Sequence, residues 1–114
     1  QLKQVILNLC KNAIDAMCEQ PNAVLSIETN YFELCNEVHI KIKDNGKGIS
    51  QENLHKIGTP FFTTKSNGTG LGLSVCYKII QEHGGRIEVQ SELGEGTMFT
   101  IVLPCIEEEQ EMND

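Results

Sequence analysis

The sequence predicts one α+β domain, a two-layer α/β sandwich in which a mixed, mostly antiparallel sheet is covered by helices on one face. Two observations predict this fold class. The expected elements run helix, strand, strand, helix, loop, helix, strand, strand, so hairpins outnumber βαβ crossovers. The 114 residues are also 39% hydrophobic and 22% charged, which suits a single domain with a real core.

The first half of the chain predicts one helix followed by two strands. Period-2 alternation predicts strands over about residues 24–32 and 37–44. Pro21-Asn22 would end the preceding helix, which we expect over residues 1–18. Its predicted apolar face consists of Leu2, Val5, Ile6, Leu9, Ala13, Ile14, Ala16 and Met17.

The second half predicts a short helix, a loop, a longer helix and a hairpin. Ser50 is a suitable cap for a helix to about Lys56. After a loop, a helix is expected from Gly70 to about His83, before Gly84-Gly85. Two alternating strands flank Gly94-Glu95-Gly96, a typical hairpin connection.

Charge and hydropathy exclude several classes of partner. The net charge of −7 argues against nucleic acid, which needs a basic surface. No apolar run reaches the roughly 20 residues of a membrane helix, and no leader peptide is expected at the start. Five of the 16 acidic residues lie in 105–114, so we expect a domain over 1–105 and a solvated acidic tail over 106–114.

The cysteines predict neither a zinc site nor a disulfide framework. There are five of them, an odd number, and no pair has C-x-x-C spacing. Most sit among apolar residues, so we interpret them as small core residues of a protein in the reducing cytoplasm. They are Cys10, Cys18, Cys35, Cys76 and Cys105.

Asp44 is the first candidate functional residue. Strand alternation places it on the same face as Val38, Ile40 and Ile42, which is the face expected to be buried. A carboxylate there needs a hydrogen-bond donor, and an exocyclic amine with a nearby water would serve. The alternative is that the strand has ended by this point and Asp44 only begins a turn.

A glycine-rich segment is the second candidate. Gly68-Thr69-Gly70-Leu71-Gly72-Leu73-Ser74 opens a predicted helix, where backbone N–H groups and the helix N-terminus favour phosphate. The G-x-G-x-G spacing without a preceding strand argues against a dinucleotide-binding fold, and a Walker motif is absent from the sequence. A flexible hinge is the alternative interpretation.

Asn8 and Asn12 form the third candidate. They lie four residues apart on a polar helix stripe with Gln4 and Asp15. Asparagine is a poor residue for a helix interior, but its amide oxygen can bind a hard cation such as Mg²⁺ beside phosphate oxygens and water. A solvated helix face is the alternative.

Taken together, these segments closely resemble the ATP-binding domain of two-component sensor histidine kinases, within the gyrase, chaperone, histidine kinase and mismatch-repair ATPase superfamily. The resemblance spans nearly the whole chain and is nearest to the sporulation and nitrogen-regulation kinases. Its fold is the Bergerat-type ATP-binding fold. It rests on five boxes in order: residues 8–16 as the N box, 44–49 as the first glycine box, 60–65 as the F box, 68–73 as the second glycine box and 94–97 as the third.

The resemblance implies residue roles for ATP and Mg²⁺. Asp44 would accept the adenine amino group with support from Thr97, Asn12 would bind Mg²⁺, and Lys65 would reach the terminal phosphates from a mobile lid. Phe61 and Phe62 would be a latch for that lid or simply pack within it. The full nucleotide-binding set would be Asn8, Asn12, Asp44, Gly46, Gly48, Ile49, Phe62, Thr64, Lys65, Gly68, Thr69, Gly70, Leu71, Gly72, Leu73 and Thr97.

One position separates reaction classes within the resemblance. ATP-hydrolysing members carry a Glu one helical turn before the magnesium Asn, and here that place is Asn8. An amide is no general base at neutral pH, so transfer to a better nucleophile is expected, with Asn8, Asn12 and Lys65 as the catalytic set. The chain departs from the family by having Asp15-Ala16 where many sensor kinases have Lys-Tyr.

The implied activity is transfer of the ATP γ-phosphoryl group to a histidine on a separate dimerisation domain, for relay to a response regulator. The alternatives are a nucleotide-sensing module and a serine-directed anti-sigma kinase. The parent kinase would be a homodimer, anchored to a membrane or not, whereas this domain would be a cytoplasmic monomer without membrane contact. His39, His55 and His83 lack the context of a phospho-acceptor and are expected to be surface or capping residues.

Overall fold

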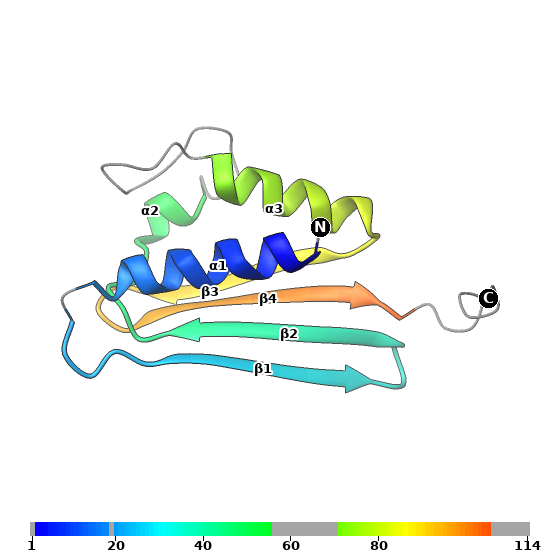
Figure 1. Ribbon diagram of the computed structural model, residues 1–114, viewed down its shortest axis with the longest axis horizontal. Coiled ribbons are helices and arrows are strands. Elements are labelled where there is room, and N and C mark those ends of the chain that lie inside the picture. The colour runs from blue at the N-terminus through cyan, green and yellow to red at the C-terminus, as the bar shows by residue number, and fades with distance from the viewer. Residues whose placement is uncertain (1, 19, 56–70, 106–114) are drawn as a thin grey trace.

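The computed structural model describes residues 2–18, 20–55 and 71–105 of the chain (Figure 1). The elements are α1 (Leu2–Ala16), β1 (Leu25–Phe32), β2 (Glu37–Asp44), α2 (Gln51–Leu54), α3 (Leu71–Glu82), β3 (Arg86–Glu92) and β4 (Gly96–Pro104). The order predicted from the sequence is confirmed. The observed ends differ from the predicted ones by no more than two residues, because terminal turns are held by local contacts that periodicity does not report.

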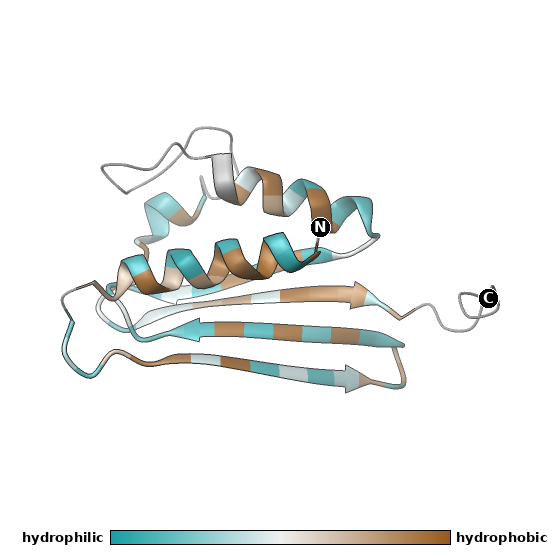
Figure 2. Ribbon diagram, in the orientation of Figure 1, coloured by the Kyte–Doolittle hydropathy of each residue, from teal (hydrophilic) through white to brown (hydrophobic). Residues whose placement is uncertain are grey.

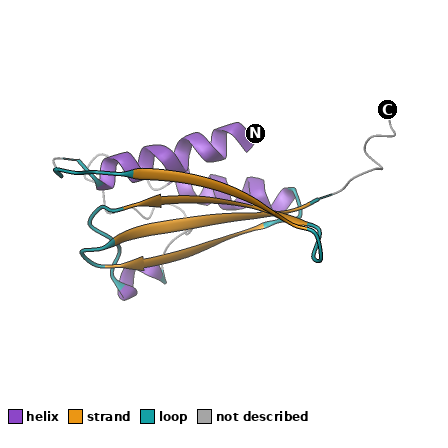
Figure 3. Ribbon diagram, turned by 90° about the horizontal axis from the view of Figure 1, so that it is seen from below, coloured by secondary structure: helices purple, strands orange, loops and turns teal. Residues whose placement is uncertain are grey.

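The four described strands form one sheet in the order β1-β2-β4-β3, and every neighbouring pair is antiparallel. A mixed sheet was expected, but no parallel pair occurs among the described strands. The described helices lie on one side of this twisted sheet, and none of them covers the other side, which we call the bare face (Figures 1 and 3). The two-layer α+β prediction is therefore confirmed.

The core lies between the sheet and the helices α1 and α3. Figure 2 shows the apolar stripe of α1 facing the sheet and the alternation of apolar and polar residues along β2. Each fully buried Leu or Ile contributes about 1.5–3 kcal/mol relative to an exposed position. The buried members of this cluster are Val5, Leu9, Ile40, Ile42, Cys76, Ile79, Ile80, Phe99 and Ile101.

The predicted apolar face of α1 is wrong at Ile14, whose side chain is 56% exposed. The buried stripe of this helix runs through Val5, Leu9 and Ala13. Ile14 follows Ala13 directly and is turned by about 100° from it around the helix, so it lies beside that stripe. A broad apolar pattern therefore overstated the buried width of this helix.

The expectation for the cysteines is also wrong for most of them. Cys76 is buried, whereas Cys10 and Cys105 are half-buried and Cys18 and Cys35 are exposed. All five are free thiols. The prediction relied on apolar sequence neighbours. Those neighbours do not make a residue buried where the chain turns at the surface, as it does at Cys18 after α1 and at Cys35 between β1 and β2.

Two of the histidines have defined surroundings. His83 follows α3, and its Nδ1 lies 2.8 Å from the carbonyl oxygen of Ile79, which confirms the capping interpretation. His39 lies on the bare face of the sheet, 3.1 Å from Glu37 and against the ring of Phe32. Among the described helices, none is long and apolar enough to cross a membrane.

Candidate functional site

A row of three polar residues ends the apolar core at one edge of the helix-covered face. Asp44 at the end of β2 is directly opposite Thr97 of β4, and Thr97 is directly opposite Ser91 of β3. The next row inward is apolar and consists of Ile42, Phe99 and Val89. We call Asp44, Thr97 and Ser91 the polar row.

Asp44 is buried, with 4% of its surface exposed. Its Oδ1 accepts a hydrogen bond of 2.8 Å from the backbone N–H of Gly46, and the backbone N–H of Thr97 also donates to the carboxyl group. Burial raises the pKa of Asp44 above its ordinary value, and the two hydrogen bonds partly oppose that shift. The inward position predicted from strand alternation is confirmed, and the carboxylate also closes the turn.

The polar row is enclosed by glycines that let backbone segments touch. A Cβ on Gly96 would lie 2.1 Å from the carbonyl oxygen of Asp44, and a Cβ on Gly48 would lie 2.1 Å from that of Glu92. Both glycines also have positive φ, of 125° and 78°. Gly46 approaches the end of α1, where a Cβ would lie 2.6 Å from the oxygen of Ala16. Three segments are therefore packed backbone to backbone around Asp44.

Asn45 attaches the turn after β2 to the connection between α1 and β1. Its Oδ1 accepts from the N–H of Val24 at 2.9 Å, and its Nδ2 donates to the oxygen of Asn22 at 3.0 Å. On the other side, the N–H of Gly94 donates to the oxygen of Lys47 at 2.8 Å. The turn that carries the first glycine box is therefore held from both sides.

Ser91 is a site residue that the sequence reasoning missed. Its hydroxyl lies 2.7 Å from the N–H of Ile49 and 2.8 Å from the carbonyl oxygen of Gly96. It also lies 2.8 Å from the hydroxyl of Thr97. A serine in an alternating strand carries no distinctive signal. Only its position two residues before the connection 93–95, on the face shared with Val89, could have indicated it.

Asn8 and Asn12 lie on one side of α1, half-buried. The amide Nδ2 of Asn8 donates to the thiol of Cys76 on α3 at 3.7 Å. The Cys76 thiol in turn donates to the oxygen of Val5 at 3.9 Å. With Nδ2 engaged, Asn8 retains its Oδ1 as an acceptor. The alternative interpretation, in which Asn8 lies on a fully solvated helix face, is therefore wrong.

The donor set suits magnesium better than a metal held by the protein alone. Among the described residues no group of three His, Cys, Asp or Glu side chains could hold a metal ion. Mg²⁺ accepts one or two protein oxygens and completes its shell with phosphate oxygens and water. The amide oxygen of Asn12 fits that kind of ligand.

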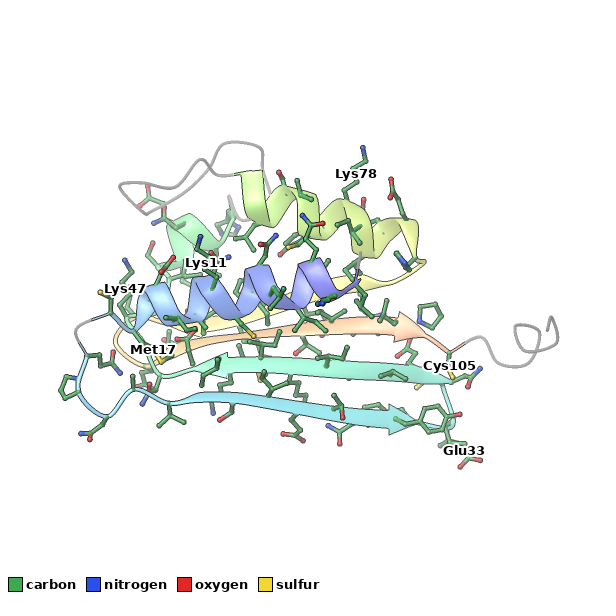
Figure 4. All side chains as sticks on the ribbon, in the orientation of Figure 1. Lys11, Met17, Glu33, Lys47, Lys78 and Cys105 are labelled. Carbon is green, nitrogen blue, oxygen red and sulfur yellow. The ribbon has the colours of Figure 1, made fainter. Side chains whose placement is uncertain are left out.

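The remaining predicted site residues are only partly placed. Phe62, Thr64, Lys65, Gly68, Thr69 and Gly70 lie outside the described residues. Leu71, Gly72 and Leu73 form the first turn of α3, which begins toward the end of the molecule where β2 ends (Figure 1). Figure 4 shows Lys11 on α1 and Lys47 after β2 at this same end.

Comparison with known proteins shows to which family this chain is similar. The sequence profile described as "Histidine kinase-, DNA gyrase B-, and HSP90-like ATPase" matches residues 1–107. Sporulation kinase E of Bacillus subtilis strain 168 is 47% identical over 111 residues, which are 97% of this chain and 15% of that kinase. The chain therefore spans a small part of this relative's length.

Solved structures agree with that comparison. The nucleotide-free catalytic domain of the histidine kinase ThkA is 40% identical, with a TM-score of 0.75, and the match covers 90% of this chain and 65% of that domain. Full-length ShkA in complex with AMPPNP is 25% identical, with a TM-score of 0.77, and the match covers 90% of this chain and 21% of ShkA.

Proposed function

Because this chain belongs to the family of histidine kinase-, DNA gyrase B- and HSP90-like ATPases, we propose that it is the Mg-ATP-binding catalytic domain of a sensor histidine kinase. It transfers the γ-phosphoryl group of ATP to a histidine on a separate dimerisation domain. The phosphoryl group then passes to an aspartate of a response regulator. The domain itself acts in the cytoplasm, within a homodimeric parent kinase.

The observation that carries this proposal is the buried carboxylate of Asp44. It lies where the apolar core ends, and the donors that the structure places on it are two backbone N–H groups. Such a carboxylate retains acceptor capacity in a largely desolvated place, where a hydrogen bond to an exocyclic amine is strong. Adenine presents that amine on a flat apolar ring, so it suits both the carboxylate and the apolar row beside it.

The triphosphate would lie toward the start of α3. Backbone N–H groups of the second glycine box and the N-terminus of α3 suit phosphate oxygens. Lys65 would add a positive charge from the lid, with Thr64 and Phe62 beside it. Bound Mg²⁺ would neutralise phosphate charge during transfer, and Asn12 would hold it by an amide oxygen.

The identity of Asn8 favours transfer over hydrolysis. Its amide is bound to the Cys76 thiol and cannot take a proton from water at neutral pH. Without a general base at this place, bound ATP survives until the histidine arrives. The domain then contributes positioning and charge neutralisation, which carry most of the barrier reduction in phosphoryl transfer.

The test is a calorimetric titration of this chain with ATP and ADP, with and without Mg²⁺, beside the Asp44→Asn variant. We expect Mg-dependent ATP binding in the wild type and binding weakened at least 10-fold in Asp44→Asn. An Asn12→Ala variant should lose the magnesium dependence but keep its fold. Unchanged affinity in Asp44→Asn would reject the adenine role.

Transfer itself is tested by adding the dimerisation domain of a related sensor kinase and labelled ATP. An acid-labile, base-stable product is expected, since phosphohistidine is hydrolysed in acid. An acid-stable product would indicate a serine-directed kinase. Tight nucleotide binding without any transfer would indicate a nucleotide-sensing module.

A further inference from the structure

The Ser91 hydroxyl has three hydrogen-bonding neighbours, and their chemistry determines where its single proton goes. The backbone N–H of Ile49 can only donate, so Ser91 accepts from it at 2.7 Å. The carbonyl oxygen of Gly96 can only accept, so Ser91 donates its proton to Gly96 at 2.8 Å. The Ser91 proton is then fully used.

This count also determines the direction of the hydrogen bond between Ser91 and Thr97. The two hydroxyl oxygens lie 2.8 Å apart, which is a normal O–H···O hydrogen bond. Because Ser91 has no second proton, Thr97 must be the donor. Thr97 is 6% exposed, so its hydroxyl has little water to which it could turn instead.

The polar row therefore offers acceptors and no side-chain donor. The Thr97 hydroxyl donates its proton to Ser91 and retains only lone pairs. Asp44 on the other side of Thr97 is a carboxylate that already accepts from the backbone N–H groups of Gly46 and Thr97. A ligand at this row must bring N–H groups. One that brings a carbonyl oxygen meets lone pairs and leaves buried acceptors without partners, which is costly.

We propose that Ser91 is a specificity-determining positioning residue, which holds the Thr97 hydroxyl as an acceptor so that the site selects a 6-amino purine over a 6-oxo purine. This inference rests on the proposed function, because it assumes that the base of a nucleotide lies against Asp44. Ser91 acts through Thr97 and does not itself touch the base.

Removing the Ser91 hydroxyl would return a rotatable proton to Thr97. That proton could then be donated to a 6-oxo group, so the penalty against such a base would fall. The same change leaves the N–H of Ile49 without its acceptor, which would weaken every nucleotide alike. The two effects are separable because only the first changes the ratio of affinities.

The test measures the dissociation constants of Mg-ATP and Mg-inosine triphosphate, which differ at position 6 of the purine and share the same phosphates. The variants are Ser91→Ala, Thr97→Val and the double variant. We expect Ser91→Ala to lower the preference for ATP by about 5-fold, the value of one neutral hydrogen bond. In the Thr97→Val background, Ser91→Ala should leave the ratio unchanged, because the group through which it acts is gone.

Two controls keep the result specific. Ser26→Ala removes a hydroxyl from an exposed place on β1 and should change neither affinity nor ratio. Ser91→Thr keeps a hydroxyl and should restore the wild-type ratio. If circular dichroism shows that Ser91→Ala is unfolded, the ratio of the two nucleotide affinities is compared between the Thr97→Val and Ser91→Thr variants instead.

The outcomes separate the inference from the function on which it rests. A wild-type chain that binds neither nucleotide would reject the proposed function, and the inference with it. A wild type that prefers ATP, with a Ser91→Ala variant that weakens both nucleotides equally, would reject the inference alone. Further loss of preference on adding Ser91→Ala to Thr97→Val would also overturn it.

Discussion

The two ends of the β2–β4 pair use polar residues in opposite ways. At the Asp44 end, the polar row is enclosed by backbone, and Gly46, Gly48 and Gly96 let the segments close on it. At the other end, Asn36 forms hydrogen bonds to Cys105 through both its backbone and its side chain. The exposed Tyr31 hydroxyl donates to the side-chain amide oxygen of Asn36.

The two ends differ in the exposure of their polar groups to water rather than in the number of hydrogen bonds. Asn36 also has a positive φ, of 55°, but it is only half-buried and its partner Tyr31 is exposed. Hydrogen bonds that exchange with water contribute modestly, whereas a desolvated acceptor discriminates strongly between ligands. Closure by glycine thus makes one end of the sheet suitable for recognition, while the other end only closes the hairpin.

The largest expected loss of stability comes from adding a Cβ to a glycine that packs against the backbone of Asp44. Gly96→Ala would force a Cβ against the oxygen of Asp44 at a φ of 125° and should cost about 3 kcal/mol or more. Gly94→Ala is the matched control, because it has a φ of 81° and nothing within 4 Å, and it should cost about 1 kcal/mol. Urea denaturation of both variants measures the difference, and equal losses would contradict the role of closure.

The second effect concerns the charge on Asp44. Asp44→Asn should weaken ATP binding by about 2 kcal/mol through loss of a charge-assisted hydrogen bond. In the wild type, the affinity should fall as the pH is lowered through the raised pKa of Asp44, because the protonated carboxyl accepts less well. Titration calorimetry against pH should show a flatter profile for Asp44→Asn.

The same pKa shift has a consequence for stability. A carboxyl group whose folded pKa lies above its unfolded value of 3.8 binds protons more tightly when folded. The stabilisation that this group contributes is fully present when the pH is below the unfolded value, and it is lost as the pH rises through the folded pKa. The pH dependence of unfolding in the nucleotide-free protein should therefore lose this component in Asp44→Asn.

A smaller effect is expected at the open end. Asn36→Ala removes the side-chain hydrogen bonds to Cys105 and Tyr31 and places alanine at a φ of 55°, at a cost of about 1.5 kcal/mol. Asn36→Gly tolerates that φ and should lose only about half as much. Thermal unfolding of the pair separates the backbone contribution from the hydrogen bonds, and nucleotide affinity should not change in either.

The smallest effect is expected on the bare face of the sheet. Arg86 lies 2.7 Å from Glu88 and 3.7 Å from Glu37, and hydrogen bonding to Glu88 raises the pKa of its guanidinium. Exposed ion pairs contribute little because water and salt screen them. Arg86→Ala should therefore leave the denaturation midpoint unchanged within error. A loss that disappears in high salt would show that this cluster does stabilise the sheet.

Much of this site could be read from the order of residues. The parity of β2 placed Asp44 inward, and the register confirms it opposite Thr97. The spacing of Asn8 and Asn12 placed both on one side of α1. These inferences succeeded because periods of 2 and 3.6 residues are local properties of the backbone.

Other features depended on contacts between distant segments. Ser91 meets Ile49 across 42 positions of the sequence, and Asn8 meets Cys76 across 68, so no local pattern could pair them. The exposure of Cys18, Cys35 and Ile14 was missed for the same reason, since burial depends on what packs above a residue.

Local order therefore determined the fold class, the element order and the presence of an inward carboxylate, because steric and hydrophobic periodicity act within each element. The tertiary structure alone decided which hydroxyl donates to which, which glycines touch backbone, and which cysteine is buried. Those properties arise where strand register and helix packing bring together groups from distant parts of the chain, and hydrogen-bond direction there depends on every neighbour at once.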